Sequence, residues 1–375
     1  MIRPVALLFI VIVAVVVSTR SARAQDRPKP PQQPAIGPGG ADYKHKQVVA
    51  HVYGMGPTRY WIFEPADPTP GDAPLVVFNH GWSAMEPKVY GAWIDHIVKR
   101  GNIVVFPVYQ DSLRTPTANF TPNAAAGIHQ AVERLRGGSG HVNPDLDKVA
   151  FVGHSMGGVI SANLAARWQA LGVPQPKAVM CVQPGKTWAM SEKVAVTLED
   201  MGFIDKDTLL LAVAGDRDRL AKDVDAKRIF KESTQVLPQN KNYVVLVSDD
   251  HGDPALVANH FAPCAPNFKY IDPVIYNSPT NGPTGGGHIR ERIRERVEER
   301  REQEGDESPD FTTETARAID ALDFYGTWKL FDGLTDAAFY GTNRDYALGN
   351  TVRQRFMGKW SDGTPVKELQ VTLTP

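Results

Sequence analysis

The residues best suited to chemistry form the run Gly153-His154-Ser155-Met156-Gly157. An apolar run precedes it and a helical pattern follows it, so a strand is expected to turn sharply into a helix at the serine. Such a turn requires small residues two positions before and two after the serine, and the two glycines meet that need. The hydroxyl would then lie beside the free N–H groups that begin the helix, which favour negative charge. The run therefore predicts a serine nucleophile.

A serine hydroxyl is a weak nucleophile at neutral pH. It needs a base, a group that orients the base, and donors for a developing oxyanion. The elements that would position these groups alternate between short apolar runs and helical patterns from residue 75 to 251. This alternation predicts an α/β fold, with a mostly parallel sheet and helices on both faces. Ligands of such sheets bind at the carboxyl ends of the strands, where Ser155 is expected.

These motifs together resemble the α/β-hydrolase superfamily over about residues 45 to 278 and a C-terminal helix. The resemblance rests on the serine run, on His80-Gly81-Trp82 after a strand-like run, and on the chain order serine, acid, histidine. Within the superfamily, the chain is most similar to open-site esterases: the bacterial cutinases and polyester hydrolases, the chlorophyllases and the platelet-activating-factor acetylhydrolases. This resemblance implies an α/β-hydrolase fold. A large cap domain is not expected, because only 26 residues lie between Val182 and Leu209.

The resemblance places the acid at the end of the apolar run Leu209 to Ala214, where Gly215-Asp-Arg-Asp218 follows. The Gly-x-x-Asp pattern of the superfamily selects Asp218. Asp216 is the alternative, although an aspartate beside a glycine is commonly a turn former.

Three histidines follow the acid: His251, His260 and His288. His251 directly follows the last strand-like run, Tyr243 to Val247, as the resemblance requires, and is expected to be the base. His260-Phe-Ala-Pro resembles the local sequence around the catalytic histidine of some polyester-hydrolysing cutinases, so His260 is the alternative. His288 lies in a highly charged segment and is not expected to act.

The resemblance also assigns the remaining parts of a site. The backbone N–H groups of Trp82 and Met156 are expected to bind the oxyanion. Trp188 is expected to contact substrate, although core packing would equally explain an indole there. His154 points the wrong way for a base in such a turn, and is expected to pack.

The residues predict a serine-dependent carboxylic-ester hydrolase that forms an acyl-enzyme on Ser155 and acts on small-molecule or polymeric esters. An acyltransferase or peptidase would use the same triad, and a non-catalytic binding module on a hydrolase fold is the alternative from another class. We expect no cofactor and no metal, because the chain has no C-x-x-C, no H-E-x-x-H and no zinc-ligand spacing.

The composition of the chain is sufficient for a sizeable hydrophobic core. The chain has 375 residues, 42% of them hydrophobic, and a net charge of −1. Without a basic excess, no nucleic-acid partner is expected, and we expect a monomer. The two cysteines, Cys181 and Cys264, would either pair in an exported protein or remain two buried thiols.

The first 24 residues have the pattern of a secretory signal peptide. Arg3 precedes the thirteen-residue apolar run from Val5 to Val17, and Ala22-Arg-Ala24 offers a cleavage site before Gln25. The run is short for a membrane span. We therefore expect a secreted or periplasmic mature chain without a membrane span, whose net charge falls to −4 as three arginines leave with the peptide.

The remaining chain divides by composition. Residues 25–44 are rich in Pro, Gln and Gly and predict a disordered linker. Residues 45–278 form the expected catalytic domain. A charged, flexible insertion is expected over residues 279–312, because 14 of the 20 residues from His288 to Glu307 are charged. Residues 313–375 are expected to supply a C-terminal helix and tail that complete the domain.

Overall fold

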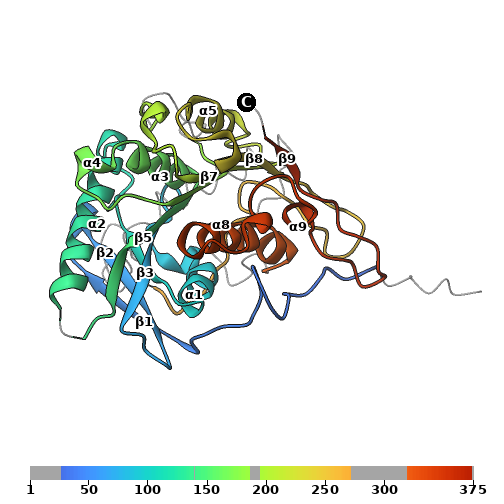
Figure 1. Cartoon of the computed structure of the whole chain (residues 1–375), viewed down its shortest axis with the longest axis horizontal. Coiled ribbons are helices and arrows are strands. Elements are labelled where there is room, and N and C mark those ends of the chain that lie inside the picture. Colours follow the sequence, from blue (N-terminus) through green and yellow to red (C-terminus); the bar gives the residue numbers. More distant parts are fainter. Residues whose placement is uncertain (1–26, 139, 186–194, 272–318, 374–375) are drawn as a thin grey trace, which may run out of the picture.

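The computed structural model describes residues 27–138, 140–185, 195–271 and 319–373 (Figure 1). The expected signal peptide, Trp188 and the charged insertion lie outside the described residues. Within these ranges, no helix is both long and apolar enough to cross a membrane.

Nine strands of the described chain form one sheet, in the order β1-β2-β4-β3-β5-β6-β7-β8-β9. The central strands β4, β3, β5, β6, β7 and β8 are parallel, whereas β1, β2 and β9 are antiparallel additions at the two edges. The expected α/β fold with a mostly parallel sheet is therefore confirmed. The strands are β1 (Gln47–Tyr53), β2 (Tyr60–Ala66), β3 (Asp72–Asn79), β4 (Ile103–Pro107), β5 (Asn143–His154), β6 (Ala178–Val182), β7 (Leu209–Gly215), β8 (Lys241–Leu246) and β9 (Gln370–Thr372).

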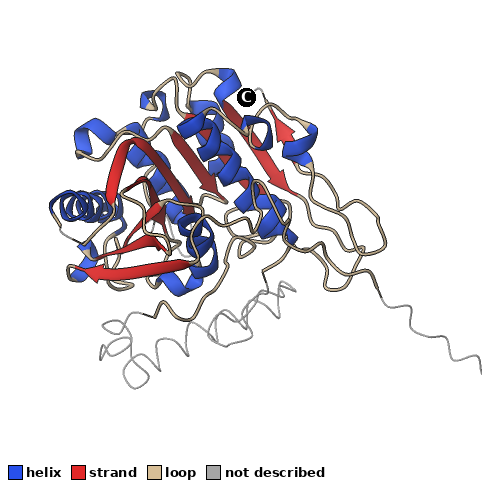
Figure 2. Ribbon diagram, turned by 60° about the horizontal axis from the view of Figure 1, so that its bottom comes forward, coloured by secondary structure: helices blue, strands red, loops and turns tan. Residues whose placement is uncertain are grey.

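Helices lie on both faces of this sheet (Figure 2). The longer ones are α1 (Gly91–Lys99), α2 (Phe120–Gly137), α3 (Met156–Ala166), α5 (Val224–Glu232), and a π-helical turn η7 (Leu322–Trp328) that continues into α8 (Lys329–Tyr340). Short helices and 3-10 turns are η1 (Gly56–Thr58), η2 (Pro87–Val89), η3 (Thr117–Asn119), α4 (Trp168–Leu171), η5 (Met201–Phe203), η6 (Pro238–Asn240), η8 (Arg344–Tyr346) and α9 (Val352–Arg355).

The sheet separates two hydrophobic cores, because successive side chains of a strand point to opposite faces. On β3, Val76 and Phe78 belong to the core that α1 and α8 cover. Leu75 and Val77 face the core that α2, α3 and α5 cover. A strand that is apolar on both faces is typical of a buried parallel sheet. This layering leaves the ends of the strands as the places where polar side chains can gather.

The N-terminal segment, expected to be a disordered linker over residues 25–44, is instead held against the C-terminal part of the chain over residues 27–44. The N–H of Gly39 donates to the buried carboxylate of Asp332 at 2.7 Å. The N–H of Lys29 donates to the hydroxyl of Ser361 at 2.9 Å. In Figure 1 this blue segment runs to the red C-terminal tail. The composition of this segment suggested disorder, but hydrogen bonds to residues far along the chain hold it in place.

A buried lysine connects α8 to that tail. The ammonium group of Lys329 donates to the carbonyl of Gln354 at 2.8 Å and to the carbonyl of Phe356 at 2.6 Å. Burial lowers the pKa of Lys329 from 10.5 to about 7. The tail then ends in β9, the edge strand beside β8.

Lys329→Met is expected to remove a pH dependence of stability. Because the pKa of Lys329 is about 7 in the fold, the unfolded chain alone protonates this amine between pH 7 and 10.5. The free energy of unfolding of the wild type should therefore fall, by up to roughly 1.4 kcal/mol per pH unit, as the pH decreases through this window. Urea unfolding at several pH values measures the slope. Lys231→Met, at an exposed position on α5, is the control. Equal slopes for the wild type and Lys329→Met would contradict the prediction.

Candidate active site

The turn at Ser155 has the sharp geometry that its sequence predicts. β5 ends at His154 and α3 begins at Met156, and Ser155 between them has φ 56° and ψ −124°. A positive φ is rare for a residue with a side chain and is held by its surroundings. A Cβ on Gly157 would lie 2.1 Å from the carbonyl oxygen of Asn79, so this position must be glycine.

Three side chains from three loops form a continuous hydrogen-bonded chain. The Nε2 atom of His260 lies 3.0 Å from the hydroxyl oxygen of Ser155, and its Nδ1 atom lies 2.8 Å from a carboxylate oxygen of Asp218. All three residues are buried. Because the carboxylate can only accept, Nδ1 carries the proton and Nε2 accepts from the hydroxyl. Ser155 and Asp218 thus come together as expected, with a different histidine between them.

The other oxygen of Asp218 is held by the backbone. It accepts hydrogen bonds from the N–H groups of Leu220 and Ala221, each at 2.9 Å. The alternative acid, Asp216, faces elsewhere: its carboxylate accepts from the N–H and the hydroxyl of Ser248 at 2.9 and 2.5 Å. Asp216 therefore joins the ends of β7 and β8, and Asp218 alone of the two reaches the imidazole.

The expectation that His251 is the base is corrected in favour of His260. The Nε2 atom of His251 lies 2.8 Å from the carboxylate of Asp362, and the side chain of His251 is 38% exposed. Asp362 belongs to the C-terminal tail, so His251 is turned toward that tail and away from Ser155.

The reason is an excursion of the chain after β8. Asp249 and Leu256 form an antiparallel bridge, so the residues between them form a closed loop. The N–H of Ala258 then donates to the hydroxyl of Ser248 at 2.9 Å, which returns the chain to the end of β8. His260 lies two residues after this return. The histidine that reaches Ser155 is therefore not the one that lies nearest to β8 in the sequence.

The returning segment is also tied to β6. The side-chain amide of Gln183, the residue after β6, donates to the carbonyl of Asn259 at 2.7 Å. A Cβ on Gly215 would lie 2.2 Å from the carbonyl oxygen of Ala258, so the end of β7 packs directly against the same segment. His260 is thus fixed by the ends of three neighbouring strands.

A second hydrogen-bonded chain, Gly81–Tyr90–His154–His260, runs beneath the first. The N–H of Gly81 donates to the hydroxyl oxygen of Tyr90 at 2.9 Å, and that oxygen lies 2.9 Å from Nδ1 of His154. The Nε2 atom of His154 lies 2.7 Å from the carbonyl oxygen of His260. This buried chain joins the turn after β3 to the serine turn and to the loop that carries His260.

The groups at the two ends of this second chain determine which atom donates and which accepts in each of its hydrogen bonds. The carbonyl of His260 can only accept, so Nε2 of His154 donates and Nδ1 accepts from the hydroxyl of Tyr90. This arrangement requires a neutral imidazole. Burial, and then the nearby His260, hold the pKa of His154 well below its ordinary value of 6.5. His154 is therefore a buried connector, which refines its expected packing role, and no sequence pattern pointed to Tyr90.

The two expected oxyanion donors occupy different settings. Met156 is the first residue of α3, where N–H groups have no partner within the helix. Trp82 follows Gly81, and a Cβ on Gly81 would lie 3.4 Å from Cβ of Ser155, so this turn lies beside the serine. Trp188 lies outside the described residues, and its expected contact with substrate stays a prediction. Cys181 and Cys264 are both buried, and they do not form a disulfide with each other.

Gly157→Ala is expected to destabilise the fold strongly, by roughly 3 kcal/mol or more, because its Cβ would overlap the carbonyl of Asn79. Thermal unfolding of the full chain measures the loss. Gly71→Ala is the matched control, since nothing lies within 4 Å of a Cβ at that position. Similar melting temperatures for the two variants would show that the serine turn relaxes without cost.

Comparison with known families agrees with this geometry. A family model described as Chlorophyllase matches residues 37–197, a range that contains the turn after β3 and Ser155 but ends before Asp218 and His260. No curated protein matches the chain significantly. The match supports the resemblance to the esterases of the α/β-hydrolase group and indicates an ester hydrolase of this type.

Proposed function

We propose that this chain is a serine-dependent carboxylic-ester hydrolase that forms an acyl-enzyme on Ser155. The observation that carries the proposal is the hydrogen-bonded chain from Ser155 through His260 to Asp218. It gives the hydroxyl a base within reach and gives the base a carboxylate that orients it, which are the two requirements for an activated serine.

The reaction follows from the positions of the protons. The oxygen of Ser155 attacks the ester carbonyl as its proton passes to Nε2 of His260, and Asp218 stabilises the imidazolium that forms. His260 then gives this proton to the departing alcohol, and the C–O bond of the ester breaks. A water molecule, deprotonated by the same nitrogen, hydrolyses the acyl group from the serine oxygen and restores the hydroxyl.

The negative charge on the carbonyl oxygen needs donors on the side opposite the base. We assign the N–H of Met156, at the start of α3, and the N–H of Trp82, in the turn beside Ser155. Each such donor contributes roughly 3 kcal/mol to lowering the barrier in comparable sites. The turn is held by the bond from Gly81 to Tyr90, so the second donor depends on that tyrosine.

The setting of the activity is part of the proposal. The signal-peptide pattern over residues 1–24 supports a secreted or periplasmic protein. The short connection between β6 and β7 supports a site open enough for bulky, including polymeric, esters as well as small ones.

Ser155→Ala and His260→Ala are each expected to lower kcat/KM on nitrophenyl esters by roughly 10⁴-fold or more, because each removes a member of the triad. His251→Ala is the matched control and should stay within about two-fold of the wild type, since its partner is Asp362. A fluorophosphonate probe should label the wild type and His251→Ala at similar rates, and should not label Ser155→Ala.

Two results would contradict the proposal. Equal labelling of the wild type and Ser155→Ala would exclude this serine as the nucleophile. A loss of turnover in His251→Ala with full activity in His260→Ala would reverse the assignment of the base.

Tyr90→Phe tests the second hydrogen-bonded chain as a positioning device. The change leaves the N–H of Gly81 and Nδ1 of His154 without their partner. We expect kcat to fall by roughly 10–100-fold while KM changes by less than about three-fold, because the oxyanion turn and the base shift relative to Ser155.

The control for this experiment is Tyr60→Phe, which removes another buried tyrosine hydroxyl, one that bonds the carbonyl of Gln130. If both variants lost stability equally and neither lost kcat, the tyrosine at position 90 would have a purely structural role.

A further inference from the structure

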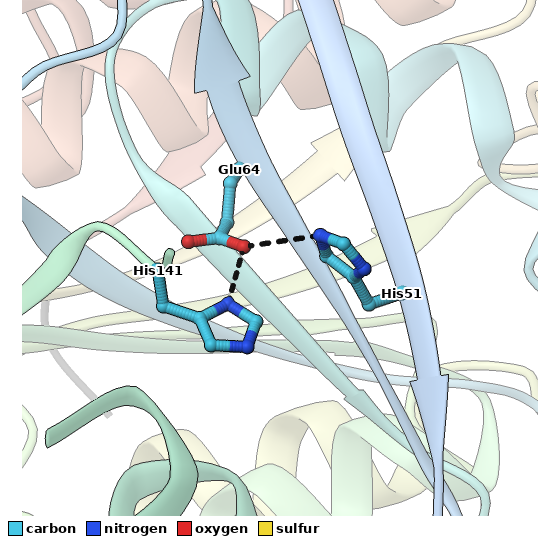
Figure 3. A group of neighbouring side chains, drawn as sticks. All are labelled: His51, Glu64 and His141. Atoms are coloured by element: carbon cyan, nitrogen blue, oxygen red, sulfur yellow. Dashed lines mark hydrogen bonds and ion pairs between the residues drawn. The ribbon is translucent and has the colours of Figure 1, made fainter. Parts of the chain in front are cut away.

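Two histidines and a buried glutamate come together at a part of the sheet that is remote from Ser155. Figure 3 shows the side chains of His51 and His141 turned toward the carboxylate of Glu64. His51 lies on β1, Glu64 lies on β2, and His141 precedes β5. Ser155 lies just beyond the carboxyl end of β5, so a residue that precedes β5 lies at the opposite end of this strand.

Strand register brings the first two residues together. His51 is paired with Ile62 and Glu64 with Val49, so His51 and Glu64 are diagonal neighbours on one face of the hairpin. His141 is then added from the connection between α2 and β5. Its Nδ1 atom lies 2.7 Å from the carboxylate oxygen Oε2 of Glu64, and Nε2 of His51 lies 3.7 Å from the same oxygen.

We propose that His51, Glu64 and His141 form a binding site for a divalent transition metal of the Zn²⁺ type. Two imidazoles and one carboxylate are a three-ligand set that Zn²⁺ accepts, with a fourth position left for water. A tetrahedral Zn²⁺ with bonds near 2.0–2.1 Å holds its ligand atoms about 3.3 Å apart. This separation lies between the two distances to Oε2, so small side-chain adjustments complete the site.

The buried charge of Glu64 supplies the driving force. Glu64 is only 4% exposed, and the basic side chains within 4 Å of its carboxylate in the described chain are the two histidines. A buried carboxylate is costly unless a positive charge or several hydrogen bonds compensate it. Neutral imidazoles carry no positive charge, whereas a divalent cation bound between them and Oε2 does.

Outer hydrogen bonds already orient two of the three ligands. The other oxygen of Glu64 accepts from the N–H of Val142 at 2.6 Å, which leaves Oε2 directed at the histidines. The Nε2 atom of His141 lies 3.1 Å from the hydroxyl of Tyr53. With a metal on Nδ1, Nε2 carries the proton and donates to that hydroxyl, the usual arrangement of a metal-binding histidine. His51 is the adjustable ligand, since its side chain is 37% exposed.

A metal at this site would connect the hairpin of β1 and β2 to the segment that leads into β5. The role of the metal would be structural, because its ligands lie in a part of the sheet that is remote from the triad. Ester turnover of the full chain should therefore be the same with and without the metal, which separates this proposal from the proposed function.

The test uses the full-length chain without a polyhistidine tag, stripped with EDTA. After incubation with excess Zn²⁺ and gel filtration, elemental analysis should find about one zinc per chain, and the melting temperature should rise by roughly 3–8 °C. His51→Ala and His141→Ala should retain less than about a fifth of that zinc. His129→Ala, which removes an exposed histidine on α2, is the control and should bind as the wild type does.

A second variant keeps the test decisive if an alanine change disturbs the fold. Glu64→Gln preserves an acceptor for the N–H of Val142 and removes the charge, so it should fold and bind zinc at least ten-fold more weakly. Wild-type chain without zinc after gel filtration, or zinc retained equally by His51→Ala and the wild type, would overturn the proposal.

Discussion

The close contact between Gly157 and the end of β3 is the constraint on which the site depends. A Cβ at this position would lie 2.1 Å from the carbonyl oxygen of Asn79 and 2.4 Å from that of His80. The start of α3 therefore rests directly on the residues that lead into the turn of Gly81 and Trp82. Because of this contact, Ser155 and the nearby N–H groups have a fixed separation, as the preorganised site of the proposed mechanism requires.

Most of the fold could be predicted because its signals are local. The apolar runs that became β3 to β8 are short, β-branched and bounded by turns, and the glycines around Ser155 mark the sharp turn. Asp218, the expected acid, could be found for a related reason, because the Gly-x-x-Asp pattern that begins at the end of β7 selects it over Asp216. These are cases in which neighbours in sequence settle the structure.

The expected contact between His251 and Ser155 was wrong, because the path of the chain after β8 depends on a loop and its tertiary contacts. The loop between Asp249 and Leu256 closes on itself, and its length cannot be seen in a periodic pattern. The two diagonal residues of the hairpin, His51 and Glu64, were missed for a similar reason: a pairing of strands, and no sequence motif, brings them together. Residues 27–44 have the composition of a linker, but their partners lie some 300 residues away, at Asp332 and Ser361.

The anchoring of the loop after β8 has a consequence for local unfolding of the molecule. Its bridge residue Asp249 accepts hydrogen bonds from the indole of Trp360 and from the N–H of Lys367. These two donors lie 111 and 118 residues further along the chain, in the segment that follows α9. If that segment detaches locally, the loop after β8 loses two of its hydrogen bonds, whereas the contact of Gly157 with the end of β3 is unaffected. The position of His260 is therefore coupled to a distant part of the chain on which the turn at Ser155 does not depend.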